Sequence, residues 1–351
     1  LNKIIKFIDR CKEMPIAYGI ANLVCSCSYE PEAFGRVAVE SQSMQIPIIA
    51  SDIGGSKETI IKDKTGFLFK NADSQELAKT IIMVMKKILV TGASGSIGQT
   101  VRKGLRNHNR FLRLSDIESL DPPVAGEELN HANLENLAEM MRACDGMDAV
   151  VHLGALAIEA PFSKILGPNI IGVHNVFEAA RRCGVKRVVF ASSNHAVGLY
   201  EVGTPLGVKE APKPDGFYGA SKAFGEGLAV LYHQKWGIES ACLRIGSFLD
   251  KPSEIRHLST WISPRDMVQL VERCLDAPEL GCVILYGVSG NERNWWGNPN
   301  AERLGYEPVD NAEEYASKIA GSGTSASRIN PAERYMGGFV AAIDYEKIDR
   351  K

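Results

Sequence analysis

A tyrosine and a lysine four residues apart, Tyr218 and Lys222, are well suited to proton transfer. In a helix such residues lie on one face, so the phenol and the ammonium would be neighbours. A tyrosine that acts as a base near neutral pH must lose its proton about three units below its usual pKa, which takes about 4 kcal/mol. A nearby positive charge supplies part of that energy. On its own, the spacing is common by chance and also fits a solvated helix face.

A group of polar residues precedes this pair. The strand-like run Val185–Ala191 is followed by the sequence SSNH at 192–195. Polar residues at the carboxyl end of a parallel strand are where α/β enzymes place their chemistry. We therefore expect Ser193 to hold the substrate oxygen on which Tyr218 acts.

The element that must position these groups is a glycine-rich turn. Glycines stand at Gly92, Gly95 and Gly98, between an apolar strand, Ile88–Thr91, and a helical pattern from Gln99. The first glycine allows the turn, the second allows the backbone to approach a pyrophosphate, and the third allows helix and strand to pack closely. The helix N-terminus offers N–H groups and a positive dipole end to the phosphates. The stretch predicts a dinucleotide site, although a glycine triplet alone can also be a plain tight turn.

An acidic residue, Asp116, follows the second predicted strand, Arg110–Ser115. It stands roughly twenty residues beyond the glycine turn, where a carboxylate accepts from the adenosine ribose hydroxyls and repels a 2′-phosphate. Its neighbour Ile117 carries no positive charge that would attract such a phosphate. The pattern favours NAD over NADP, while an Asp that closes a strand can also be a simple turn residue.

The nicotinamide end of the cofactor is expected beside the strand Asp148–Gly154 and the residues after it. Its positive charge, together with Lys222, would lower the pKa of Tyr218. Asn133 and Leu134 stand where an adenine-contacting pair usually lies. The residues expected at the cofactor are Gly92, Gly95, Ser96, Ile97, Gly98, Asp116, Ile117, Asn133, Leu134, Leu153, Gly154, Ala155, Ala157, Tyr218 and Lys222.

The composition excludes several classes of function. The 351 residues suffice for two domains, and 45% are hydrophobic and 23% charged, as in ordinary globular proteins. A formal net charge of −2 gives no electrostatic case for nucleic acid or anionic membranes. No apolar run approaches the roughly 20 residues of a membrane span. Eight scattered cysteines without CxxC pairs argue against a metal site and fit a reducing cytoplasm, where we expect the protein.

Residues 1–86 form a separate α/β segment in this interpretation, with strands predicted over 21–28 and 46–50 and a final helix over Gln75–Lys86. The spacing of Glu32 and Glu40 and the loop Gly54-Gly55 resemble the donor half of a family-4 glycosyltransferase of the GT-B type. In that family the second glutamate contacts the donor's ribose and the glycine loop faces its phosphates. The acceptor half and the basic residues that neutralise the diphosphate are absent. We therefore expect a non-catalytic fragment, joined at residue 86 without a polar linker.

From residue 87 onward, the motifs TGASGSIG, HLGA, NIIG, SSN and YGASK together resemble the extended short-chain dehydrogenases/reductases. The resemblance implies an α/β fold with a Rossmann-like, doubly wound parallel sheet that binds NAD, and a small C-terminal substrate cap from about residue 245. Many members are nucleotide-sugar epimerases or dehydratases, which is the alternative function. Those enzymes usually carry an Asn-x-Tyr-Gly loop after Arg244, whereas this chain reads Ile245-Gly-Ser247. A third possibility is a non-catalytic NAD-binding regulator.

Longer stretches, FASSNHAVGLY at 190–200, PDGFYGASKAFGEGLA at 214–229 and NWWGN at 294–298, closely resemble the uronate dehydrogenase family. That family oxidises C1 of D-galacturonate or D-glucuronate with NAD to an aldarolactone. The resemblance implies that Tyr218 is the base for the C1 hydroxyl, and that Lys222 lowers its pKa and holds the nicotinamide ribose. It further implies that sugar hydroxyls bind Ser193, Asn194 and His195, the carboxylate binds Ser247 and Arg256, and the nicotinamide contacts the backbone of Ile245.

Physical arguments apply to two positions, Arg256 and Ala157. A bidentate guanidinium is the best-matched partner for a uronate carboxylate, which supports Arg256, although alone Arg256 also fits a surface ion pair with Glu254. Ala157 stands where the family usually has a serine, and the missing hydroxyl would cost about 1 kcal/mol of binding or shift which uronate is preferred. The expected partners are a sugar acid substrate and further copies of the same chain, in a homo-oligomer.

Overall fold

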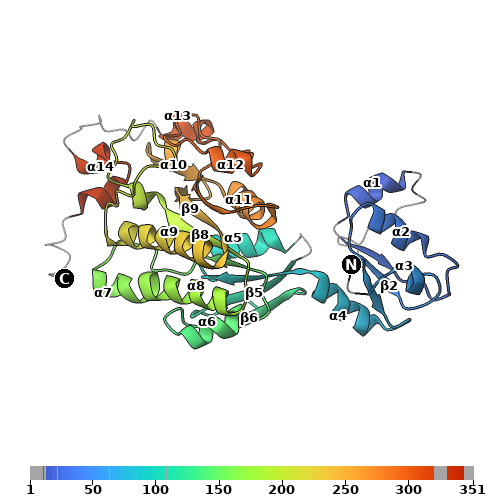
Figure 1. Cartoon of the computed structure of the whole chain (residues 1–351). Helices are drawn as coiled ribbons and strands as arrows, with labels where there is room; N and C mark the ends of the chain where they lie inside the picture. The colour runs from blue at the N-terminus through green and yellow to red at the C-terminus, as the bar shows by residue number, and fades with distance from the viewer. Residues whose placement is uncertain are drawn as a thin grey trace. The chain divides into compact units, whose positions relative to one another are not determined.

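The computed structural model describes residues 11, 13–21, 23–62, 64–106, 110–319 and 330–343. The chain divides into two compact units, Leu1–Lys86 and Lys87–Lys351, each with its own parallel sheet (Figure 1). Within the described residues, no helix is both long enough and apolar enough to cross a membrane.

The first unit is a small α/β body with a three-stranded parallel sheet. Its strands lie in the order β1 (Val24–Ser26), β2 (Ile48–Ser51) and β3 (Phe67–Phe69). Its helices are α1 (Met14–Gly19), α2 (Arg36–Ser43), α3 (Ser56–Thr59) and α4 (Ser74–Val84). The last helix ends two residues before the predicted end, because Lys86 is already the first residue of strand β4, which continues into the second unit.

The second unit is built on a seven-stranded sheet in the order β12-β9-β8-β7-β4-β5-β6. Its strands are β4 (Lys86–Thr91), β5 (Arg110–Asp116), β6 (Glu127–His131), β7 (Ala149–His152), β8 (Arg187–Ser193), β9 (Glu239–Ile245) and β12 (Cys282–Gly287). The chain runs outward from β4 to β6, then returns to β7 on the other side of β4 and continues to β12. This reversal creates the switch point at which doubly wound sheets bind ligands. The predicted Rossmann-like fold is confirmed.

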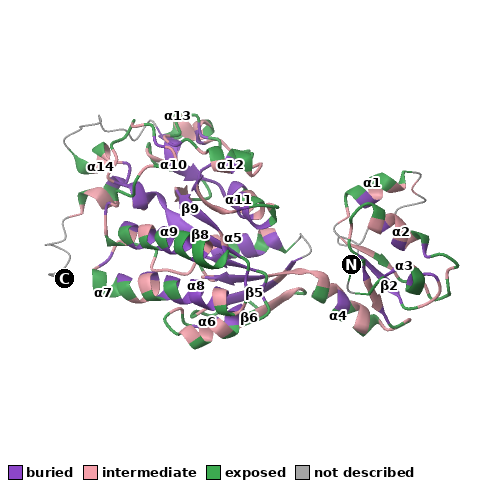
Figure 2. Cartoon of the chain, viewed as in Figure 1, coloured by how far each residue is buried: buried purple, intermediate pink, exposed green. Residues whose placement is uncertain are grey.

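Helices cover both faces of this sheet (Figure 1). One face carries α5 (Ser96–Leu105) and α11 (Pro264–Asp276), and the other carries α6 (Leu137–Cys144), α8 (Gly172–Arg182) and α9 (Phe217–Trp236). Side chains alternate across a strand, so Ile88 and Val90 enter the first core and Leu89 enters the second. Figure 2 shows the result, with buried strands between helices that expose their outer sides.

The part predicted as a substrate cap, from about residue 245, mixes short elements outside the main sheet with elements that return to it. The short elements, together called the cap, are β10 (Ser247–Phe248), α10 (His257–Thr260), β11 (Trp261–Ile262), α13 (Ala316–Ile319) and α14 (Pro331–Arg334). Helix α12 (Pro299–Arg303) instead places Ala301 in the first core of the main sheet. Between these pieces, α11 and β12 return to the main sheet. Trp296 stacks on Tyr286 with ring centroids 4.9 Å apart, so this tryptophan packs the cap.

Candidate active site

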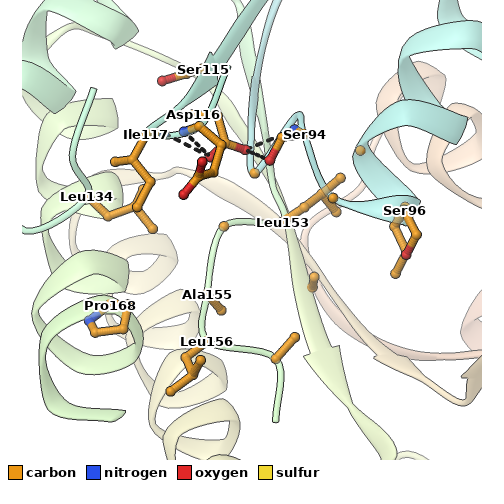
Figure 3. A pocket seen from close by; sticks show the side chains of 18 of the residues that line it. Ser94, Ser96, Ser115, Asp116, Ile117, Leu134, Leu153, Ala155, Leu156 and Pro168 are labelled. Carbon is orange, nitrogen blue, oxygen red and sulfur yellow. Dashed lines mark hydrogen bonds between the residues drawn. The ribbon is translucent and has the colours of Figure 1, made fainter. Parts of the chain in front are cut away.

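A cavity of about 610 Å³ opens at the switch point between β4 and β7 (Figure 3). Its lining includes all the residues that the sequence predicted at a cofactor, from Gly92 to Ile245. It also includes Ser193 and the pair Tyr218 and Lys222. Four predicted substrate-binding residues are not part of this lining and adjoin it instead, namely Asn194, His195, Ser247 and Arg256.

The three glycines of the turn have different surroundings. A Cβ added at Gly92, where φ is +70°, would lie 2.5 Å from the backbone nitrogen of Gly154, and one at Gly98 would lie 2.2 Å from the carbonyl oxygen of Gly92. These two glycines therefore allow close packing of strand and helix. A Cβ at Gly95 would approach nothing in the protein closer than the Gly92 oxygen, at 3.4 Å. Space thus remains in front of Gly95, at the start of α5, for a ligand.

The carboxylate of Asp116 is fixed at the end of β5 by four hydrogen bonds. One oxygen accepts from the backbone nitrogen and the hydroxyl of Ser94, at 2.9 and 2.8 Å, and the other accepts from the nitrogens of Ile117 and Glu118 (Figure 3). The acid therefore faces the glycine turn, as a ribose-binding carboxylate must. Sequence analysis did not name Ser94, whose signal is a hydroxyl inside the glycine turn.

Tyr218 and Lys222 lie one turn apart on α9, with the lysine Nζ 5.4 Å from the centroid of the tyrosine ring. Burial raises the pKa of Tyr218 to about 12, while a hydrogen bond with Ser193 lowers it and the charge of Asp215 raises it further. Burial lowers the pKa of Lys222 to about 7. Lys222 lines the cavity, and its Nζ has no hydrogen-bond partner among the described residues.

The start of α9 is held from both sides, which fixes the position of Tyr218. The carboxylate of Glu159 accepts from the backbone nitrogens of Phe217 and Tyr218, both at 3.0 Å. The hydroxyl of Ser221 donates to the carbonyl of Tyr218 and accepts from the Asn169 amide. Asn169 lies in a short π-helix, Leu166–Ile171, a local distortion that often accompanies functional sites.

Arg256 contacts Ser247 and Asn194, the residue that follows Ser193 in the chain. Its Nη1 donates to the hydroxyl of Ser247 at 3.2 Å, and its Nε and Nη2 donate to the carbonyl of Met336 at 3.0 and 2.7 Å. With its amide oriented to suit its neighbours, Asn194 accepts from Nη2 at 2.6 Å and donates to the carbonyl of Ile245. These contacts bring Asn194, Ser247 and Arg256 together.

No carboxylate of the described residues forms an ion pair with Arg256, and Glu254 lies 4.0 Å from His257 instead. Burial lowers the pKa of Arg256, while the charges of Asp215 and Glu254 raise it. A half-buried guanidinium without a carboxylate partner favours an anionic ligand.

His195 approaches the tyrosine edge-on, with ring centroids 5.8 Å apart. Its Nδ1 lies 2.7 Å from a carboxylate oxygen of Asp215, whose side chain is fully buried. The sequence analysis named His195 and missed Asp215. Its position three residues before the tyrosine, in PDGFYG, is the sequence signal that could have identified it.

The residues that resemble a glycosyltransferase have partners within the first unit. Glu40 accepts from the hydroxyl of Tyr18 at 2.9 Å and from Arg36 Nε at 2.5 Å. A Cβ on Gly54 would lie 2.6 Å from the carbonyl oxygen of Glu32, so the glycine loop packs against the chain itself.

Two family descriptions match different parts of the chain. The description "NAD dependent epimerase/dehydratase family" matches residues 88–251, and "Glycosyl transferases group 1" matches residues 1–88. The uronate dehydrogenase of Pseudomonas syringae pv. tomato is 41% identical over 267 residues, which cover 76% of this chain and 97% of that protein.

Two solved structures are similar as well. The crystal structure of uronate dehydrogenase from Agrobacterium tumefaciens has a TM-score of 0.71 and 42% identity, and it covers 74% of this chain and 98% of its own. A glucuronic acid dehydrogenase from Chromohalobacter salexigens has a TM-score of 0.73 and 38% identity, over 75% of this chain and 99% of its own. With a relative that is 41% identical over nearly its whole length, the chain belongs to the uronate dehydrogenase family.

Proposed function

We propose that the second unit oxidises a hexuronic acid, D-galacturonate or D-glucuronate, at C1 and releases the aldarolactone. The observation that carries this proposal is the guanidinium of Arg256. It contacts Ser247 and Asn194 and forms no ion pair with a carboxylate of the described residues. A sugar with a carboxylate supplies the missing charge, whereas a neutral sugar leaves the guanidinium uncompensated.

The cavity suits NAD at its other end. The open space at Gly95 admits a pyrophosphate, the fixed carboxylate of Asp116 suits the adenosine ribose hydroxyls, and Lys222 is without a hydrogen-bond partner among the described residues. A related uronate dehydrogenase has been solved in complex with NAD. Bound NAD would supply the acceptor for the hydride that leaves C1.

Tyr218 takes the proton of the C1 hydroxyl, while Ser193 donates a hydrogen bond to the same oxygen. C1 thus loses a hydride, its hydroxyl oxygen loses a proton to Tyr218, and the C1–O unit becomes the lactone carbonyl. To act near pH 7, Tyr218 must lose its proton about five units below its pKa in the protein alone, which takes about 7 kcal/mol. This energy exceeds the value of about 4 kcal/mol expected from the sequence, because burial disfavours the phenolate. The cation of Lys222 and the positive charge of the cofactor must therefore stabilise the phenolate more strongly.

The test is the appearance of NADH absorbance when the full chain, NAD and either uronate are mixed. We expect turnover by wild type and a loss of at least about 100-fold in Tyr218→Phe, since a general base contributes 10²- to 10⁴-fold. Galactose and glucose serve as neutral controls and should react poorly. Turnover that survives in Tyr218→Phe would contradict the assigned base, and absence of turnover with both uronates would contradict the substrate class.

Two other functions remain to be separated by the same assay. A nucleotide-sugar epimerase would consume a UDP-sugar without net NADH formation, and a regulator would bind NAD without turnover of either substrate. We propose that the first unit is not catalytic, because Glu40 and the loop at Gly54 are engaged by the chain itself.

We further propose a homo-oligomer whose subunits meet through the outer side of α9. Phe217, Phe224 and Leu231 recur every seven residues and are about two-fifths exposed, at 39, 39 and 41%. Ala220 and Gly227 lie exposed along the same side and leave room for a close approach. Light scattering should give a multiple of the 38.3 kDa chain mass, and Phe224→Glu should reduce it. A monomeric wild type would contradict the proposal.

A further inference from the structure

His195 and Asp215 form a pair next to the reacting tyrosine. The histidine Nδ1 lies 2.7 Å from one carboxylate oxygen, and the backbone nitrogen of Asp215 donates to the carbonyl of His195 at 3.4 Å. The carboxylate is fully buried, and its second oxygen has no partner among the described residues. The histidine is therefore the side-chain contact that anchors this carboxylate.

The chain makes room for the carboxylate with glycines from separate segments. A Cβ at Gly198 would lie 2.0 Å from the Asp215 oxygen, and one at Gly337 would lie 1.7 Å from it. Gly337 follows Met336, whose carbonyl receives the guanidinium of Arg256. The carboxylate thus lies against the segment that also holds the proposed acid-binding arginine.

We propose that Asp215 is a positioning residue that keeps the proton of neutral His195 on Nδ1, so that Nε2 accepts a hydrogen bond from a hydroxyl of the bound sugar acid. This inference rests on the proposed function and extends it to the recognition of the sugar hydroxyls.

The argument follows from what each atom can do. An ionised carboxylate accepts hydrogen bonds and donates none, so the nitrogen that faces it must carry the proton. In a neutral imidazole the other nitrogen is then an acceptor. A hydroxyl of the substrate is the matching donor, whereas the ring oxygen and the ring carbons of a sugar carry no O–H or N–H group to donate.

The charge of the Asp215 carboxylate is unfavourable for the proposed general base. Its charge raises the pKa of Tyr218 and so opposes formation of the phenolate. It also raises the pKa of Arg256 and favours the guanidinium cation there. A buried charge that works against the base needs another role, and orientation of His195 provides one.

The tautomer can be measured without substrate. In the full chain labelled with ¹⁵N at histidine, the His195 signals are identified by their loss in His195→Gln. We expect wild type at pH 8 to carry the proton on Nδ1, and Asp215→Asn to shift the population toward Nε2–H because an amide can donate to Nδ1. A proton on Nε2 in wild type would overturn the proposal, even if the variant does not fold.

Kinetics test the consequence for binding. Asp215→Asn should raise KM for the uronate by about 10- to 100-fold with a smaller change in kcat, because a ground-state hydrogen bond is lost. His195→Gln should behave alike, and the double variant should be no worse than either single one. Asp266→Asn removes another buried carboxylate, outside the cavity lining, and should leave KM unchanged.

The outcomes separate this inference from the proposed function. If wild type turns over neither uronate, the proposed function fails. The tautomer measurement still tests whether Asp215 holds the proton of His195 on Nδ1, because it needs no substrate. If Asp215→Asn matches wild type in KM, or if its effect persists fully in the His195→Gln background, Asp215 does not act through His195.

Discussion

The ammonium nitrogen of Lys222 lies 5.4 Å from the centre of the Tyr218 ring, one helical turn further along α9. Burial drives both groups toward their neutral forms, since it raises the pKa of Tyr218 to about 12 and lowers that of Lys222 to about 7. Each group would favour the charged form of the other. In the protein alone, the burial of Lys222 therefore costs stability near pH 7, whereas Tyr218 stays protonated there in both the folded and the unfolded chain.

Lys222→Met should therefore stabilise the NAD-free protein and abolish NADH formation. Between pH 7 and 10.5 the unfolded chain keeps a proton that the folded lysine gives up, so the free energy of unfolding of wild type rises with pH in that window. The variant lacks this term. We expect a gain on the order of 1 to 3 kcal/mol near pH 7 that shrinks toward pH 10.5, measured by urea unfolding. A variant less stable than wild type at pH 7 would contradict the prediction.

The glycines of the turn provide a matched pair of variants. Gly98→Ala places a Cβ 2.2 Å from a backbone oxygen and should lower the free energy of unfolding by about 2 to 4 kcal/mol. Gly95→Ala meets no protein atom closer than 3.4 Å and should fold normally, yet bind NADH at least about tenfold more weakly, because its methyl enters the ligand's space. Urea unfolding and fluorescence titration measure the two effects. Equal NADH affinity in Gly95→Ala and wild type would exclude the phosphate-binding role.

Local patterns in the sequence predicted much of this fold. The strand β4, the glycine turn and helix α5 are consecutive, so their pattern is readable over a short window. The strands β6, β9 and β12 were not predicted, and β12 joins the sheet through parallel pairing with β9, more than thirty residues earlier. Such pairing leaves no local signature beyond an apolar run.

The candidate site divides in the same way. Tyr218 and Lys222 share one face of a helix, and their spacing of four residues in the sequence predicted this. The link from Arg256 to the carbonyl of Met336 spans 80 residues and depends on a backbone atom, which carries no sequence signal. The role of Glu159 at the start of α9 is likewise set by tertiary contacts.

A buried histidine should make the second unit sensitive to acid. His152 shares a hydrogen bond of 2.7 Å with the hydroxyl of Thr91, and burial, together with the charge of Lys222, lowers its pKa to about 3. Below about pH 6.5 this histidine binds a proton in the unfolded chain but not in the folded one. The free energy of unfolding therefore falls on acidification, by up to about 1.4 kcal/mol per pH unit. Urea unfolding at pH 7, 6 and 5 should show a smaller pH slope in His152→Asn. An unchanged slope would assign the acid sensitivity to other groups.

The second unit should act without the first. The strand β4 is anchored within its own unit, because the backbone nitrogen of Lys87 donates to the carboxylate of Asp148 at 2.7 Å. The P. syringae relative matches 97% of its own length to 76% of this chain. A chain that begins at Met85 should keep kcat/KM for the uronate within about twofold of the full chain, as measured by NADH absorbance. Loss of activity in a soluble, folded product would show that residues 1–84 take part.

Arg256→Lys is the sharpest test of how the acid is recognised. The guanidinium uses Nε and Nη2 on the carbonyl of Met336 and Nη1 on Ser247, so its orientation depends on its planar fork. A lysine keeps the charge and loses this geometry. We expect KM for the uronate to rise by about 10- to 100-fold with NAD affinity unchanged, since a charge-assisted pair is worth about 1.5 to 3 kcal/mol. Arg265→Lys, at an exposed ion pair with Asp310, should have no such effect. If Arg256→Lys kept the wild-type KM, charge alone would suffice, and if Arg256→Gln kept it too, the carboxylate would have to bind elsewhere.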